Sequence, residues 1–177
     1  MANREAIREL QARLASRLQA ARDEGFSVSW LAIKCGGRNY LLPLAQSGEI
    51  FPITNLQPMP YARPWFRGVV NLRGGLYGVV DLATFVAEDA SVPGPLAPPA
   101  PEAVVVTLSA ALNVNCALLV NMLSGLRHAG GFASAKAPTA ESPPYFGNCF
   151  TDAAGESWQE INLQTLAQLP RFLNITA

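Results

Sequence analysis

Apolar residues recur at helical spacing in the first segment of the chain. Over residues 4–22 an apolar residue falls every three or four positions, and arginines and glutamates occupy positions between them. This spacing places the apolar side chains on one face of a helix. The apolar stripe consists of Ile7, Leu10, Leu14, Leu18 and Ala21. We predict an amphipathic helix within residues 1–25, ended by Gly25, that either docks on a partner or packs on its own domain.

After Gly25 the pattern changes to short β-prone runs separated by turn residues. Residues 28–35 and 39–44 flank Gly36-Gly37-Arg38, which predicts a β-hairpin. The β pattern continues through residues 48–54. A proline-rich stretch, residues 91–101, then predicts an extended linker, because dense proline disfavours both helix and sheet interior.

A second hairpin is predicted in the stretch from residue 64 to residue 82. Its apolar runs, residues 69–72 and 76–82, are separated by Arg73-Gly74-Gly75. Gly78 within the second run indicates a bulge or a close backbone approach.

The second half of the chain repeats this organisation. Further β-prone runs occupy residues 103–109, 113–123, 143–150 and 157–163, and residues 165–173 predict a short closing helix. Two elements recur at a separation of about 80 residues: an aromatic pair, Trp65-Phe66 and Tyr145-Phe146, and a strand end, Asp81-Leu82 and Asn162-Leu163.

These patterns predict an all-β fold with an N-terminal amphipathic helix and a short C-terminal helix. We expect a domain over residues 26–177, made of two small SH3-like β-barrel lobes at about 26–90 and 102–170, joined by the linker at 91–101. Closing each sheet into a barrel would remove exposed strand edges.

Composition limits the function classes. The chain is 50% hydrophobic and 15% charged, with a formal net charge of zero, so no overall field attracts nucleic acid or anionic membranes. Its apolar runs are shorter than the ~18 residues that a membrane helix needs. Three scattered cysteines are typical of a reducing compartment. We therefore expect a cytoplasmic protein that does not insert directly into the membrane.

Catalytic and metal-binding patterns are missing from the sequence. His128 is the single histidine, and the cysteines and carboxylates do not cluster. An enzyme would need His128, a cysteine and a carboxylate to converge in the fold. We expect no enzymatic activity and no cofactor.

The stretch at 64–82 carries the strongest functional signal, because arginines and glycines interrupt its apolar runs. A phosphate loop would place its glycines before a helix, whereas a strand-like run follows here, so we reject that interpretation. Arg63, Arg67 and Arg73 lie among four aromatic residues in a segment without acids. This combination leaves open, as the alternative, a barrel that binds single-stranded nucleic acid.

A protein-binding surface agrees better with this stretch. Arginine is enriched at interfaces because its planar fork forms paired hydrogen bonds and stacks on aromatic rings. A purely structural interpretation stays open as well: the glycines would serve turns, and the arginines would pair locally with Glu49 or Asp81.

Residues 66–74, Phe-Arg-Gly-Val-Val-Asn-Leu-Arg-Gly, and the following Val-Val-Asp-Leu at 79–82 closely resemble the central motif of CheW-like proteins. The upstream Gly36-Gly37 turn and Gly48-Glu49-Ile50 also match that family's pattern. The resemblance extends over about residues 27–169 and implies two β-barrel lobes around a shared core.

The resemblance also implies a function. CheW-like proteins are non-catalytic adaptors that couple the cytoplasmic tip of a methyl-accepting chemoreceptor to the regulatory domain of a CheA-type histidine kinase. It implies association with membrane chemoreceptor arrays through these partners, and no binding to nucleic acid. The implied protein-interaction residues are Arg73, Asn71, Gly74, Glu49, Gly68, Arg67, Val69 and Val70.

The two ends of the chain are similar to a subfamily. The amphipathic leader, Val28-Ser29-Trp30, residues 158–163 and Phe172-Leu173 resemble PilI-type proteins. Those proteins serve the chemosensory system that controls type IV pilus twitching motility, which this resemblance implies for the present chain.

Overall fold

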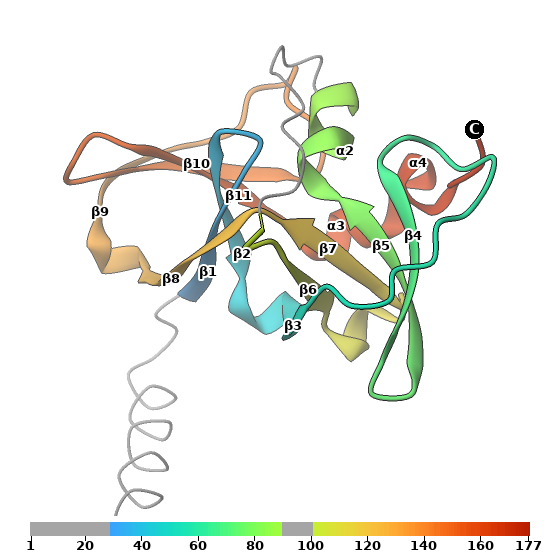
Figure 1. The fold of residues 1–177 in the computed structure, drawn as a ribbon. Coiled ribbons are helices and arrows are strands. Elements are labelled where there is room, and N and C mark those ends of the chain that lie inside the picture. The colour runs from blue at the N-terminus through green and yellow to red at the C-terminus, as the bar shows by residue number, and fades with distance from the viewer. Residues whose placement is uncertain (1–28, 90–100) are drawn as a thin grey trace, which may run out of the picture.

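The computed structural model describes residues 29–89 and 101–177, which form two β-sheets with short helices between and beside them (Figure 1). The first sheet has six strands in the order β8-β1-β2-β11-β10-β9, and the second has five in the order β3-β6-β7-β5-β4. The strands are β1 (Ser29–Cys35), β2 (Arg38–Pro43), β3 (Ser47–Pro52), β4 (Phe66–Leu72), β5 (Gly75–Asp81), β6 (Val104–Leu108), β7 (Cys116–Val120), β8 (Met122–His128), β9 (Phe132–Lys136), β10 (Phe146–Asp152) and β11 (Ser157–Ile161). The helices are η1 (Leu44–Gln46), α2 (Leu82–Asp89), η2 (Ala110–Leu112), η3 (Ala129–Gly131), α3 (Leu163–Gln168) and α4 (Pro170–Leu173).

The predicted hairpin at the start of the domain is confirmed. Strands β1 and β2 pair antiparallel from Trp30–Pro43 to Cys35–Arg38. The connecting residues Gly36 and Gly37 have φ angles of 58° and 73°. Positive φ angles at both central residues are typical of a two-residue turn whose twist matches that of the flanking strands. Glycine adopts these angles without strain.

Each sheet combines strands from both halves of the chain, so the two sheets differ in composition from the two predicted lobes. One hairpin from each half pairs with strands of the other half. Strand β2 pairs parallel with β11, and β5 pairs parallel with β7. Parallel neighbours require a long connection, so these pairs join strands that are distant in sequence. The hairpin β1–β2 therefore belongs to the sheet of β10–β11, and β6–β7 belongs to the sheet of β4–β5.

The internal repeat recurs in the hydrogen bonds of the backbone. The amide of Asp81 donates to the carbonyl of Trp65, and the amide of Asn162 donates to that of Tyr145, both at 2.8 Å. The acceptors Trp65 and Tyr145 directly precede β4 and β10. The donors Asp81 and Asn162 directly precede α2 and α3. Two halves of unlike sequence thus build the same strand–strand–helix unit.

The same two donor residues also cap the helices that follow. Asp81 Oδ1 accepts the amide of Thr84 at 3.2 Å at the start of α2, and Asn162 Oδ1 accepts that of Thr165 at 3.0 Å at the start of α3. A side-chain oxygen at this position satisfies an amide that the helix leaves free. The apolar pattern did not predict α2, although Asp81 and Thr84 carry its start signal.

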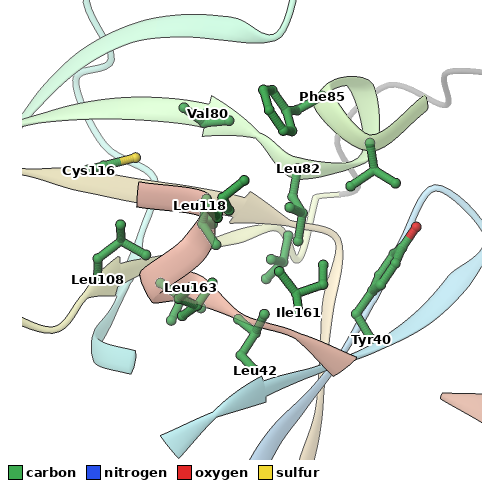
Figure 2. Packing of buried hydrophobic residues seen from close by; sticks show 14 of the residues in the cluster. Tyr40, Leu42, Val80, Leu82, Phe85, Leu108, Cys116, Leu118, Ile161 and Leu163 are labelled. Atoms are coloured by element: carbon green, nitrogen blue, oxygen red, sulfur yellow. The ribbon is translucent and has the colours of Figure 1, made fainter. Parts of the chain in front are cut away.

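The core has one shared cluster and one smaller cluster in each sheet. The shared cluster includes Tyr40, Leu42 and Ile161 from the first sheet and Val80 and Leu118 from the second (Figure 2). The second sheet adds a cluster around Val70 and Val105, and the first adds an aromatic cluster around Trp30 and Trp158. Burial of these side chains is the main stabilising term of the domain, at roughly 25 cal/mol per Å² of apolar surface.

The predicted fold class is confirmed at the level of a mostly β, two-sheet protein with few helices. Strand pairing does not close either sheet within the described residues, so closed SH3-like barrels are not seen there. The predicted N-terminal helix lies outside the described residues, as does the linker except for Pro101. The predicted run at 113–123 ends earlier, at Val120, and β8 and β9 had no clear sequence signal. The closing helix is present as α3 and α4.

Candidate functional site

The β4–β5 hairpin presents Arg73 and Gly74 at its tip. Their φ angles are 50° and 82°, the paired positive values of a two-residue turn. Asn71 Oδ1 accepts the amide of Gly74 at 3.0 Å and so holds the turn from within β4. An arginine in the left-handed region is uncommon outside such turns, and here glycine at the next position allows the turn to close.

Arg73 reaches from this tip to the edge strand β3. Its guanidinium lies 2.7 Å from Glu49 Oε2 and 5.5 Å from the centre of the Phe51 ring. The Arg73 and Glu49 side chains are 73% and 56% exposed, so the pair is open to solvent. Thr107 positions Glu49: its hydroxyl accepts the Glu49 amide at 2.8 Å. The site thus combines a fixed cation, its carboxylate and an aromatic ring on one exposed surface.

Gly68 forms a tight contact beneath this surface. Its φ is 131°, and a Cβ atom there would overlap the backbone of Gln57. Gln57 and Val69 exchange two backbone hydrogen bonds, at 2.8 and 2.9 Å. The Val69 side chain is half-buried, and Val70 is 2% exposed within the core of the second sheet. Gly68 and Val70 therefore shape the site from inside, and Val69 reaches the surface in part.

Arg67 belongs to a different contact. Its guanidinium lies 3.6 Å from the carboxylate of Asp81, whose side chain is only 12% exposed. The structure therefore brings together Arg73, Asn71, Gly74 and Glu49, and separately Arg67 with Asp81. Local pairing of the arginines with Glu49 and Asp81, the structural interpretation left open by the sequence, is observed for both pairs.

The aromatic residues of this stretch do not form a platform for nucleic-acid bases. Trp65 is fully buried and Phe66 is 9% exposed, because both pack in the shared core. Tyr61 is 88% exposed but stands apart from the Arg73 pair in sequence and in its contacts. Tyr77 and Phe51 are partly buried against the core of the second sheet, and Arg73 is paired with Glu49. Stacking needs exposed rings beside free cations, so these residues give the nucleic-acid alternative no support.

His128, Cys35 and Cys116 lie on three different strands, β8, β1 and β7. His128 ends β8, where its Nδ1 lies 2.9 Å from the Ser29 hydroxyl. Burial raises the pKa of the Cys116 thiol to about 12, and burial together with Asp81 raises that of Cys35, so both thiols stay protonated at neutral pH. Among residues 29–89 and 101–177, His, Cys, Asp and Glu side chains do not gather in threes to hold a metal ion.

Sequence reasoning missed two clefts that the internal repeat places at matching positions. The first has a volume of about 280 Å³ and is lined mainly by apolar side chains, among them Phe66, Val69 and Leu173. The second, about 290 Å³, is lined by Phe146, Cys149 and polar residues including Arg38 and Gln159. Gly78, which we expected to mark a bulge or close approach, lies in the first cleft, where a Cβ atom would press on the Phe66 ring. Gly78 was therefore the sequence feature that indicated the first cleft.

Comparisons with known proteins agree on one family. The CheW-like domain family matches residues 29–171. Protein PilI of Pseudomonas aeruginosa is 32% identical over 79 residues, which cover 45% of this chain and 44% of that protein. The chain thus spans less than half the length of this curated relative.

A solved structure shows the same fold. The scaffolding protein TtCheW from Thermoanaerobacter tengcongensis superposes with a TM-score of 0.60 over 77% of this chain and 89% of its own, at 11% identity. In the described part of the chain, every helix is too short or too polar to cross a membrane.

Proposed function

The chain belongs to the CheW-like domain family, and we propose that it is a non-catalytic adaptor that couples a methyl-accepting chemoreceptor to a CheA-type histidine kinase. The family match over residues 29–171 supports a scaffold role in chemotaxis-type signalling. Its similarity to PilI supports a place in the chemosensory system of type IV pili. An adaptor of this kind transmits receptor state by binding both partners, so its effect is a coupling free energy between two sites.

The exposed Arg73–Glu49 pair at the two-residue β4–β5 turn is the observation that carries the receptor-facing part of this proposal. Asn71 and Gly74 hold the turn, and Gly68, Val69 and Val70 support the strand below it. Arg67 stabilises the base of the hairpin through Asp81. An exposed ion pair adds little to stability, at about 0–1 kcal/mol, so its placement on a fixed turn is better explained by recognition.

Charge reversal separates recognition from local pairing. Arg73→Glu should weaken binding to a soluble fragment of the receptor tip at least about tenfold, a change of roughly 1.4 kcal/mol. The double variant Arg73→Glu/Glu49→Arg restores an ion pair of opposite orientation. If the partner recognises the arginine, this double variant stays weak in binding while its stability recovers.

Arg38→Glu is the matched control, because Arg38 is also exposed at a hairpin turn but belongs to the other sheet. It should leave receptor-tip binding unchanged. Full receptor binding by a folded Arg73→Glu variant would contradict the role assigned to Arg73, and recovery of binding in the double variant would assign it to local pairing alone.

The kinase-facing half of the proposal is tested separately. Calorimetric titration with the regulatory domain of the CheA-type kinase from the same organism should give saturable binding near a 1:1 ratio. A single-stranded oligonucleotide should not compete. Absence of binding by the folded protein would leave the family assignment in place but remove this function.

A further inference from the structure

Three large apolar side chains are exposed around one end of the first sheet and the neighbouring strand of the second. Leu126 in β8 is 57% exposed, Leu44 in η1 is 44% exposed, and Ile50 in β3 is 43% exposed. We call this group the Leu44–Ile50–Leu126 surface. Single exposed apolar residues are ordinary, whereas a group of them on one surface indicates an interaction site.

The strand register places this surface on the side of the shared core. Leu126 pairs directly with Leu31, and Ile50 pairs directly with Val106. Directly paired residues of antiparallel strands point to the same face of a sheet. Because Leu31 and Val106 both lie in the shared cluster, Leu126 and Ile50 extend that cluster to its exposed rim.

The described chain begins at the same place. Ser29 pairs with His128 at the end of β8, and Trp30 pairs with Pro43, directly before Leu44. Adjacent strands are about 4.8 Å apart, so Ser29 lies about one strand spacing from β8 on one side and from the end of β2 on the other. The helix η1 packs against both β1 and β3, which joins Leu44 to the edge that carries Ile50.

The segment before Ser29 has the chemistry to cover this surface. Residues 4–22, which lie outside the described residues, carry the apolar stripe of Ile7, Leu10, Leu14, Leu18 and Ala21. A helix of that length would be about 28 Å long at 1.5 Å per residue. Residues 23–28 can span up to about 20 Å when extended, which is enough to turn such a helix back onto the sheet.

We propose that residues 4–22 form a helix that docks its apolar stripe on the Leu44–Ile50–Leu126 surface of the same chain. The covalent link to Ser29 gives the segment a high effective concentration at this surface, which favours docking within one chain over docking on a second molecule. Arg73 contacts both Glu49 and Phe51, the residues on either side of Ile50 in β3, so Ile50 points to the opposite face from the Glu49–Arg73 pair. The docked segment therefore leaves the Glu49–Arg73 pair accessible.

Paramagnetic relaxation in the full-length chain tests this placement. A nitroxide label is attached at Ser16→Cys, on the polar side of the predicted helix, in a Cys149→Ser background that removes the partly exposed native thiol. The methyl signals of Leu44, Ile50 and Leu126 should be lost. Those of Leu173 should persist, because α4 lies across the molecule from β1 (Figure 1).

Two further samples complete the test. Leu10→Glu/Leu14→Glu in the labelled chain should restore the lost methyl signals, since it places charge in the stripe. A mixture of nitroxide-labelled chain with separately isotope-labelled chain should show no loss. Persistent Leu44 and Leu126 signals in the first sample, or signal loss in the mixture, would overturn docking within one chain.

Discussion

The two halves of the molecule have the same arrangement of strands but differ in the side chains that line their clefts. Phe66 pairs with Val80 and Val69 pairs with Gly78 in one half, and Phe146 pairs with Ile161 and Cys149 with Gln159 in the other. Gly78 leaves an apolar cleft open. Gln159 instead donates hydrogen bonds to the carbonyls of Gly147 and Glu160, both at 2.9 Å, and polar side chains join the apolar ones in lining the matching cleft.

The hairpin tips differ in the same way. One tip is a two-residue turn of Arg73 and Gly74 held by the neutral amide of Asn71. The other is a longer turn held by a carboxylate, Asp152, which accepts the Trp158 indole N–H and two backbone amides. A repeated scaffold can thus keep one set of backbone contacts while each half acquires its own chemistry, which agrees with the proposal that the protein binds two unlike partners.

The largest difference between the halves should appear at Gly68 and its counterpart Asn148. Gly68→Ala forces a side chain into the left-handed region and against the Gln57 backbone, which should lower the free energy of unfolding by about 3 kcal/mol. Asn148→Ala, on an exposed strand position, should change it by less than about 0.5 kcal/mol. Urea denaturation measures both changes in unfolding free energy, provided that the slope of this free energy against urea concentration is the same in each variant. Equal losses would mean that the two bulges are equivalent.

The helix caps should show a smaller contrast. Asn162→Ala removes a cap from α3 and should cost about 1 kcal/mol. Asp81→Ala removes the cap from α2 and also leaves Arg67 without its carboxylate, so it should cost about 2 kcal/mol. Asp81→Asn keeps an oxygen for the cap and should fall between the wild type and Asp81→Ala. Thermal and chemical unfolding would show whether the order holds.

The smallest effect concerns acid. Hydrogen bonds from the Trp158 indole and from the amides of Glu156 and Ala154 lower the pKa of Asp152. A lowered pKa in the folded state means that this stabilisation is present above the ordinary aspartate pKa of about 3.9 and is lost as pH falls through the lowered value. Stability should therefore decline below about pH 4, and less steeply in Asp152→Asn.

Unfolding midpoints between neutral and acidic pH measure this decline. Asn71→Asp is the reciprocal variant, since it places a carboxylate at the other hairpin and should steepen the decline. An Asp152→Asn profile parallel to that of the wild type would contradict the assignment to Asp152.

Much of the local structure followed from the sequence. The Gly36-Gly37 and Arg73-Gly74 turns were readable because positive φ angles at a two-residue turn favour glycine, and the flanking apolar runs set the strands. The repeat of Trp65-Phe66 and Tyr145-Phe146 was also readable, because both aromatic pairs begin the same strand–strand–helix unit. These are short-range effects of backbone geometry and side-chain burial.

Tertiary structure alone decided which strands meet and which charges pair. The parallel pairs β2–β11 and β5–β7 depend on packing around the shared core, and neither hairpin pattern specifies its neighbour. For Arg73 the sequence offered Glu49 or Asp81 as partners, and the fold pairs it with Glu49 because β3 and the β4–β5 turn meet at one surface. Long-range contacts of this kind arise from the packing of distant segments, which local propensity does not encode.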